Sequence, residues 1–108
     1  MKFYECIFIT KQNISMQEVY KITDSCRNLI LRMNGKIITT EYWGLRILAY
    51  IIKKNKKGHY VFLRIQSGNI LIKTIENDFK INENIIKFLI TKIKNNKTNF
   101  ANTEQLVI

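Results

Sequence analysis

Residues 36–66 read KIITTEYWGLRILAYIIKKNKKGHYVFLRIQ, and this stretch decides the fold. Residues 36–52 and 59–66 are rich in β-branched and aromatic side chains, which favour extended strands. Between them, residues 53–58 are polar and end in glycine, which predicts a basic hairpin loop. Gly44 interrupts the first of the two strands and predicts a bulge or a close backbone approach. The stretch therefore predicts a long β-hairpin.

The chain before this hairpin predicts a strand followed by a helix. Residues 3–9 (FYECIFI) are aromatic and β-branched, which is typical of a strand. Ser15 and Glu18 have the spacing of a capping box at the start of a helix. Apolar residues then recur at helical spacing, at Val19, Ile22, Cys26, Leu29, Ile30 and Met33. Asn34 and Gly35 end this helix, and we expect Gly35 to take the left-handed conformation.

The chain after the hairpin predicts a second helix and a fourth strand. Residues 67–69 (SGN) predict a turn, with Asn69 as the N-cap of the helix. The apolar stripe of this helix consists of Leu71, Ile72, Ile75 and Phe79. Residues 85–93 predict the last strand. The order β-α-β-β-α-β indicates an α+β fold of the ferredoxin-like split β-α-β type, with two helices on one face of a four-stranded antiparallel sheet.

Length and composition fit one domain. The chain has 108 residues, of which 46% are hydrophobic, and this is enough for a packed core rather than global disorder. We expect residues 1–94 to form the domain. Residues 95–108 are rich in Asn and Thr, and we expect them to form a flexible C-terminal tail. The tail ends in three apolar residues, Leu106, Val107 and Ile108, which a mobile tail does not need.

Alternation within residues 59–66 predicts which side chains face the helices. Three apolar residues are expected to point to the helices, namely Val61, Leu63 and Ile65. Tyr60, Phe62 and Arg64 then point to the opposite, open face. Aromatic rings beside arginine on an open sheet are used by RNA-recognition domains to stack bases, although such rings serve cross-strand packing and protein contacts equally well. The signature of the RNA-recognition domain is absent, so we do not interpret the chain as a generic reader of single-stranded RNA.

Positive charge is concentrated on the hairpin. The chain has 18 Lys and Arg against 8 Asp and Glu, a net charge of +10, and residues 36–66 contribute +6 of it. The tip alone holds Lys53, Lys54, Lys56 and Lys57. Such an excess predicts an anionic partner, either nucleic acid or a membrane surface. Lysines on a protruding hairpin suit phosphate contacts, although they also keep a hairpin tip solvated.

Several functional classes lack their sequence signature. No apolar run approaches the roughly 18 residues of a membrane span, and the N-terminus does not resemble a signal peptide or a presequence. Cys6 and Cys26 form no C-x-x-C pair and cannot complete a zinc site with a single histidine. We therefore expect buried reduced thiols, with no metal and no cofactor.

The sequence also predicts no enzyme. His59 is the only histidine, and as a general base it would need an orienting group and a nucleophile. The serines do not lie in a nucleophile-elbow motif. Two alternatives stay open at this point: a small enzyme of the same fold, such as a phosphatase, and a basic peripheral membrane protein. The mixed charge of the first helix argues against the membrane protein.

Five short motifs resemble the bacterial small-subunit ribosomal protein S6 family. They are Phe3-Tyr4-Glu5, Trp43-Gly44-Leu45-Arg46, Leu48-Ala49-Tyr50, Gly58-His59-Tyr60 and Asn82-Glu83-Asn84-Ile85-Ile86-Lys87-Phe88. The resemblance covers residues 1 to about 94. Two features depart from the family: Ile51 stands where many members have proline, and the chain does not end in the acidic tail that some members extend with glutamates.

The resemblance implies a structural, non-catalytic component of the small ribosomal subunit. Members of the family bind the central domain of the small-subunit ribosomal RNA as a heterodimer with ribosomal protein S18, which supports subunit assembly and translation. By this resemblance, Arg46 is the best single candidate for a contact to RNA or to the partner. The implied location is the ribosome of the bacterial cytoplasm, or alternatively that of a mitochondrion or plastid.

Charge, expected exposure and resemblance together give two sets of expected site residues. The expected RNA-binding residues are Lys2, Arg46, Lys53, Lys54, Lys56, Lys57, His59, Arg64, Lys92 and Lys94. The expected partner-binding residues are Trp43, Leu45, Tyr60, Phe62, Leu106 and Val107. We expect the domain to act as a rigid clamp that holds phosphates around a folded RNA junction and does not read base sequence.

Overall fold

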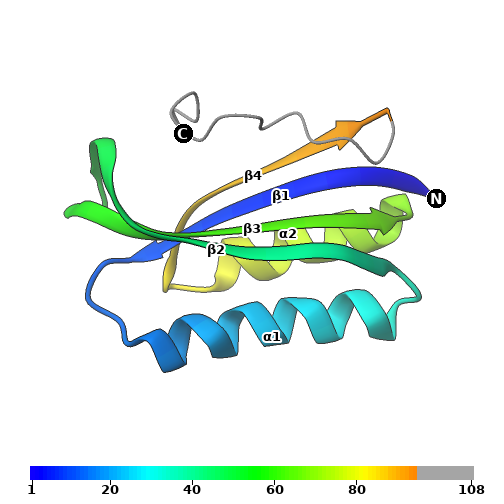
Figure 1. The fold of residues 1–108 in the computed structure, drawn as a ribbon, viewed down its shortest axis with the longest axis horizontal. Helices are drawn as coiled ribbons and strands as arrows, with labels where there is room; N and C mark the ends of the chain where they lie inside the picture. Colours follow the sequence, from blue (N-terminus) through cyan, green and yellow to red (C-terminus); the bar gives the residue numbers. More distant parts are fainter. Residues whose placement is uncertain (95–108) are drawn as a thin grey trace.

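A computed structural model describes residues 1–94 of the chain (Figure 1). Its six elements are β1 (Lys2–Lys11), α1 (Met16–Arg32), β2 (Lys36–Ile52), β3 (Asn55–Ser67), α2 (Asn69–Ile81) and β4 (Ile85–Ile93). The strands form one antiparallel sheet in the order β2-β3-β1-β4, and both helices lie on one face of it. This confirms the predicted ferredoxin-like split β-α-β fold. The expectations for the tail, including those for Leu106 and Val107, lie outside the described residues.

Local signals set the two ends of α1. The Ser15 hydroxyl accepts a hydrogen bond from the Glu18 N–H at 3.1 Å, as an N-cap does, so the predicted helix start is confirmed. At the other end, the prediction for Gly35 is wrong, because Asn34 takes the left-handed conformation, with φ of 66°. Gly35 serves packing instead, since a Cβ atom there would lie 2.7 Å from the Leu71 side chain.

The start of α2 also differs from the prediction. Its N-cap is Gly68, which provides no side-chain cap, and Asn69 is the first helical residue. The Asn69 side chain accepts a hydrogen bond from the Tyr4 hydroxyl at 3.3 Å. Asn69 therefore ties the helix to β1, a tertiary role that a local capping pattern does not reveal.

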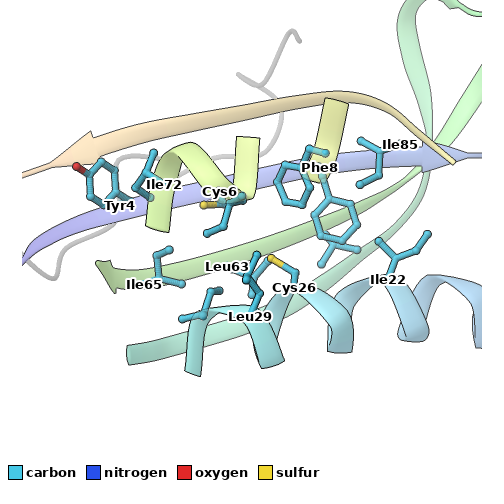
Figure 2. Packing of buried hydrophobic residues seen from close by; sticks show 14 of the residues in the cluster. Tyr4, Cys6, Phe8, Ile22, Cys26, Leu29, Leu63, Ile65, Ile72 and Ile85 are labelled. Atoms are coloured by element: carbon cyan, nitrogen blue, oxygen red, sulfur yellow. The ribbon is translucent and has the colours of Figure 1, made fainter. Parts of the chain in front are cut away.

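The main core lies between the sheet and the two helices (Figure 2). Its aromatic centre is Phe79 of α2, whose ring centroid lies 5.2 Å from that of Phe8 and 5.3 Å from that of Phe88. Cys6 and Cys26 are free, buried thiols in the same core, as predicted. Burial raises the pKa of Cys26 to about 12, and raises the pKa of Cys6 as well. Both are therefore structural thiols rather than reactive ones.

The hairpin turn is much shorter than the predicted loop at residues 53–58. Only Lys53 and Lys54 form the turn, with φ of 47° and 67°, as in a two-residue type I′ turn. The Asn55 side chain secures it by donating a hydrogen bond of 3.0 Å to the Lys53 carbonyl. Lys56 and Lys57 therefore belong to β3 rather than to a loop, and Lys57 pairs with Ile47 of β2.

The far end of the hairpin bends toward the face that the helices leave free (Figure 1). Gly58 allows β3 to approach β1 closely near the base of this bend, because a Cβ atom there would overlap the Ile9 side chain and lie 2.9 Å from the Thr10 carbonyl. A second apolar cluster forms beneath the bend, from Ile7, Ile9, Leu48, Tyr60, Phe62 and Ile86. This end of the sheet face is therefore packed rather than open.

Candidate nucleic-acid interface

The bulge predicted at Gly44 is present in β2. Gly44 has a φ of 99°, and the pairing register with β3 shifts between Tyr42 and Gly44. Beside the bulge, the indole of Trp43 stacks on the ring of Phe62, with centroids 5.0 Å apart. Through Trp43, the edge strand β2 packs against the second apolar cluster.

Arg46 lies over two aromatic rings beside the bulge, those of Trp43 and Tyr60. Its guanidinium carbon is 5.6 Å from the ring centroid of Trp43 and 5.9 Å from that of Tyr60, and its Nε–H donates to the Trp43 carbonyl at 2.9 Å. Within residues 1–94 no carboxylate pairs with Arg46. Burial raises the pKa of the Tyr60 hydroxyl, an effect that the Arg46 charge opposes. These contacts hold the guanidinium group in one orientation, with its remaining N–H groups as donors. No carboxylate of the described chain neutralises its positive charge.

Arg64 has a different environment on the same face. Its Nε–H lies 3.4 Å from a carboxylate oxygen of Glu5, which is fully buried, and its guanidinium lies 5.8 Å from the Phe62 ring centroid. The Arg64 guanidinium thus provides a positive partner for the buried Glu5 carboxylate. Because the Nε–H of Arg64 is used by Glu5, an RNA contact at Arg64 would have to use its terminal N–H groups.

The predicted exposed rings of Tyr60 and Phe62 are not found. Both point away from the helices, as the alternation predicts, but their exposed fractions are only 6% and 1%. Trp43 stacks on Phe62, and Arg46 lies over Tyr60. The two rings therefore form part of a second core. Their burial contradicts the expectation of an exposed stacking surface, and the partner contact at these positions stays a prediction.

His59 is likewise buried, with an exposed fraction of 6%. Its Nδ1 lies 2.8 Å from the Tyr42 hydroxyl, and its Nε2 is buried without a hydrogen-bond partner in the part of the chain that the structure describes. A ring covered in this way does not present a nitrogen to RNA, so the predicted contact at His59 does not fit its burial.

The expected lysine contacts fall into two groups. Lys53, Lys54, Lys56 and Lys57 are exposed on the hairpin, and none of them forms an ion pair within residues 1–94. The second group lies at the opposite end of the sheet, where β1 begins and β4 ends, and comprises Lys2, Lys92 and Lys94. The fold thus separates residues that the sequence placed in one set.

One lysine near the hairpin was missed by the sequence reasoning. Lys87 of β4 donates a hydrogen bond of 3.1 Å to the Tyr50 hydroxyl of β2, although β2 and β4 are the two opposite edges of the sheet. The bent hairpin brings the two side chains together. No local pattern around Lys87 could have signalled it, because the contact depends on how far the hairpin folds across the sheet.

Other kinds of site are not found in the described chain. No group of three or more metal-ligating side chains gathers anywhere in residues 1–94. Within the same residues, neither helix is long and apolar enough to cross a membrane. Of the expected partner-binding residues, Leu45 is exposed and Trp43 is half-buried beside it.

Comparison with known proteins supports the family resemblance. A sequence profile described as Ribosomal protein S6 matches residues 3–92. The small ribosomal subunit protein bS6 of Rickettsia prowazekii (strain Madrid E) is 49% identical over 92 residues, which cover 85% of this chain and 76% of that protein. The bS6 protein of Paramagnetospirillum magneticum is 40% identical over 94 residues, covering 87% and 65%. The crystal structure of 30S ribosomal protein S6 from Thermotoga maritima superposes with a TM-score of 0.81 at 26% identity, covering 85% of this chain and 87% of that one. The chain therefore belongs to the ribosomal protein S6 family.

Proposed function

We propose that this chain is a structural, non-catalytic component of the small ribosomal subunit and binds small-subunit ribosomal RNA. The names of its relatives support the ribosomal role. The observation that carries RNA binding is the hairpin, where four exposed lysines stand without an ion pair in residues 1–94. An uncompensated cluster of this kind favours a polyanion, because binding releases the counterions condensed on phosphates.

The mechanism follows from how the lysines are held. The two-residue turn holds the backbone of Lys54, and Lys57 pairs with Ile47 of β2, so less backbone freedom is lost on binding than in an open loop. Ammonium groups contact phosphates as point charges and carry no base specificity. RNA whose folded form places phosphates opposite the hairpin would bind best, which stabilises that form over competing ones.

The partner part of the proposal is a heterodimer with ribosomal protein S18 on the central domain of the RNA. It comes from the family resemblance. Leu45 supports it, because its side chain is 47% exposed next to the half-buried Trp43 and offers apolar surface at the sheet edge. The proposed location is the ribosome in the bacterial cytoplasm, with an organellar ribosome as the alternative.

A salt titration tests the RNA part. A transcript of the central domain is bound to the full chain, with and without S18, and affinity is measured by filter binding between 50 and 300 mM salt. We expect a steep log–log slope that falls by about 2–3 in the variant Lys54→Gln/Lys56→Gln/Lys57→Gln. The matched control, Lys21→Gln/Arg32→Gln/Lys73→Gln, removes the same charge from exposed helix positions and should leave the slope unchanged. A slope near zero for the unmodified chain would overturn the proposal.

A binding assay tests the partner part. Purified S18 should co-elute with this chain in gel filtration, and Leu45→Asp should weaken that complex without unfolding the domain, because it places a charge on the exposed apolar edge. Co-elution that survives Leu45→Asp unchanged would place the partner elsewhere on the chain.

A further inference from the structure

A hollow of about 280 Å³ opens where the hairpin tip, the end of α2 and the start of β4 come together. Each of these three elements contributes one lysine to its lining, namely Lys53, Lys80 and Lys87. Its remaining lining is apolar and consists of Phe79, Ile85, Ile86 and Phe88. No carboxylate is among the lining residues, so three positive charges surround an apolar floor without neutralisation.

Lys87 is held in place within this hollow. Its ammonium nitrogen lies 3.1 Å from the Tyr50 hydroxyl oxygen and 5.8 Å from the Tyr50 ring centroid. The phenol hydroxyl orients the ammonium group but leaves its charge intact. Only one of its three N–H donors is used by Tyr50, so the others can serve an anion.

Two of the three lysines also have a local explanation, and these explanations do not account for the convergence. Lys80 lies in the last turn of α2, where a cation is stabilised by the helix dipole. Lys87 lies on an edge strand, where charge discourages strand addition from other chains. Neither effect requires Lys53 to reach the same hollow from the hairpin turn. A bound anion would use all three side chains at once.

We propose that the hollow lined by Lys53, Lys80 and Lys87 binds a phosphate of the RNA strand. The inference rests on the proposed RNA-binding function and adds a second contact to it. RNA bound here touches both the hairpin tip and β4, so it fixes the bent hairpin against the opposite edge of the sheet. The exposed hairpin lysines then contact phosphates farther along the same RNA.

The test compares two triple variants of the full chain, bound to the central-domain transcript in the presence of S18. Lys53→Gln/Lys80→Gln/Lys87→Gln should bind about tenfold more weakly and lower the salt slope by about one, the loss of one phosphate contact. Lys21→Gln/Arg32→Gln/Lys73→Gln removes equal charge elsewhere and should stay within twofold of the unmodified chain. Thermal unfolding of both variants checks that each is folded.

A double-mutant cycle tests the positioning of Lys87. Tyr50→Phe keeps the ring and removes the hydroxyl, and we expect it to weaken RNA binding about threefold in the unmodified chain and not at all when Lys87 is glutamine. If the unmodified chain binds with a steep salt slope and the hollow variant matches the control variant, this inference is overturned while the proposed function stands. If the unmodified chain shows no salt-dependent binding, the proposed function itself fails.

Discussion

The indole of Trp43 lies on the ring of Phe62, with centroids 5.0 Å apart and planes 10° from parallel. Trp43 belongs to the edge strand β2 and Phe62 to the neighbouring strand β3, and the bulge at Gly44 lies beside the stack. The indole N–H donates to a Glu41 carboxylate oxygen at 3.0 Å, and the Trp43 carbonyl accepts from Arg46. Trp43 therefore connects the second apolar cluster to the arginine that the family resemblance singles out.

Replacing Trp43 by alanine should lower the free energy of unfolding by about 2 kcal/mol, because it removes a half-buried aromatic surface and uncovers Phe62. Urea denaturation measures the change. Trp43→Phe keeps a stacking ring and should lose less than half as much. Leu45→Ala, at the exposed neighbouring position, should change stability by no more than about 0.5 kcal/mol. Equal losses for Trp43→Ala and Leu45→Ala would contradict a structural role for the stack.

The element order could be predicted because it depends on local patterns. Alternation in residues 59–66 and helical spacing in α1 and α2 each report which face is buried, and the sheet has a single helix-covered face to satisfy. Ser15 and Gly44 act through neighbours in the sequence, so their roles as N-cap and bulge are confirmed. The bounds of β2 and β4 also agree with the prediction.

What could not be predicted depends on contacts between distant parts of the chain. Gly35 and Gly58 are required by side chains of α2 and β1, which no local rule for glycine reveals. The bent hairpin accounts for two features of the site that the sequence did not indicate. It buries Tyr60 within the second cluster, and it brings Lys87 to the hairpin.

Gly58→Ala should destabilise the domain by about 2 kcal/mol or more. The added Cβ would overlap the Ile9 side chain and crowd the Thr10 carbonyl, and backbone cannot move away as a flexible side chain can. Gly68→Ala is the matched control, because a Cβ atom at this position meets nothing within 4 Å. Alanine is a weaker N-cap residue than glycine, so this change should lower the free energy of unfolding by less than about 1 kcal/mol. Chemical denaturation of the two variants gives the comparison. Equal stability of the two would show that the hairpin does not need this close approach.

Alkaline pH should destabilise the domain through its buried thiols. Burial, and to a lesser extent Asp78, raises the pKa of Cys26 to about 12, while the thiol of the unfolded chain titrates near 9. Above that lower value the unfolded chain loses its proton first, so stability falls as pH rises from about 9 toward 12, by up to about 1.4 kcal/mol per pH unit for each thiol. Stability is fully present below pH 9. Denaturation midpoints measured from pH 7 to 10.5 should fall less steeply in Cys26→Ala, and parallel curves for the two proteins would exclude the thiol as a cause.

Arg46 offers a way to separate RNA contact from partner contact. Arg46→Lys keeps the charge but loses the planar group that lies over Trp43 and Tyr60 and the fixed hydrogen bond to the Trp43 carbonyl. If Arg46 contacts a phosphate, Arg46→Ala should weaken RNA binding about tenfold and lower the salt slope by about one, whereas Arg46→Lys should keep the slope and lose about threefold in affinity. If Arg46 contacts S18, both variants should weaken the protein complex in gel filtration and leave the salt slope of RNA binding unchanged.

We expect the result for a phosphate contact. The described chain gives Arg46 oriented N–H donors and no carboxylate, and an unneutralised guanidinium is better matched by a phosphate than by an apolar protein edge. Unchanged RNA and S18 binding in Arg46→Ala would leave Arg46 with only its packing on the aromatic cluster.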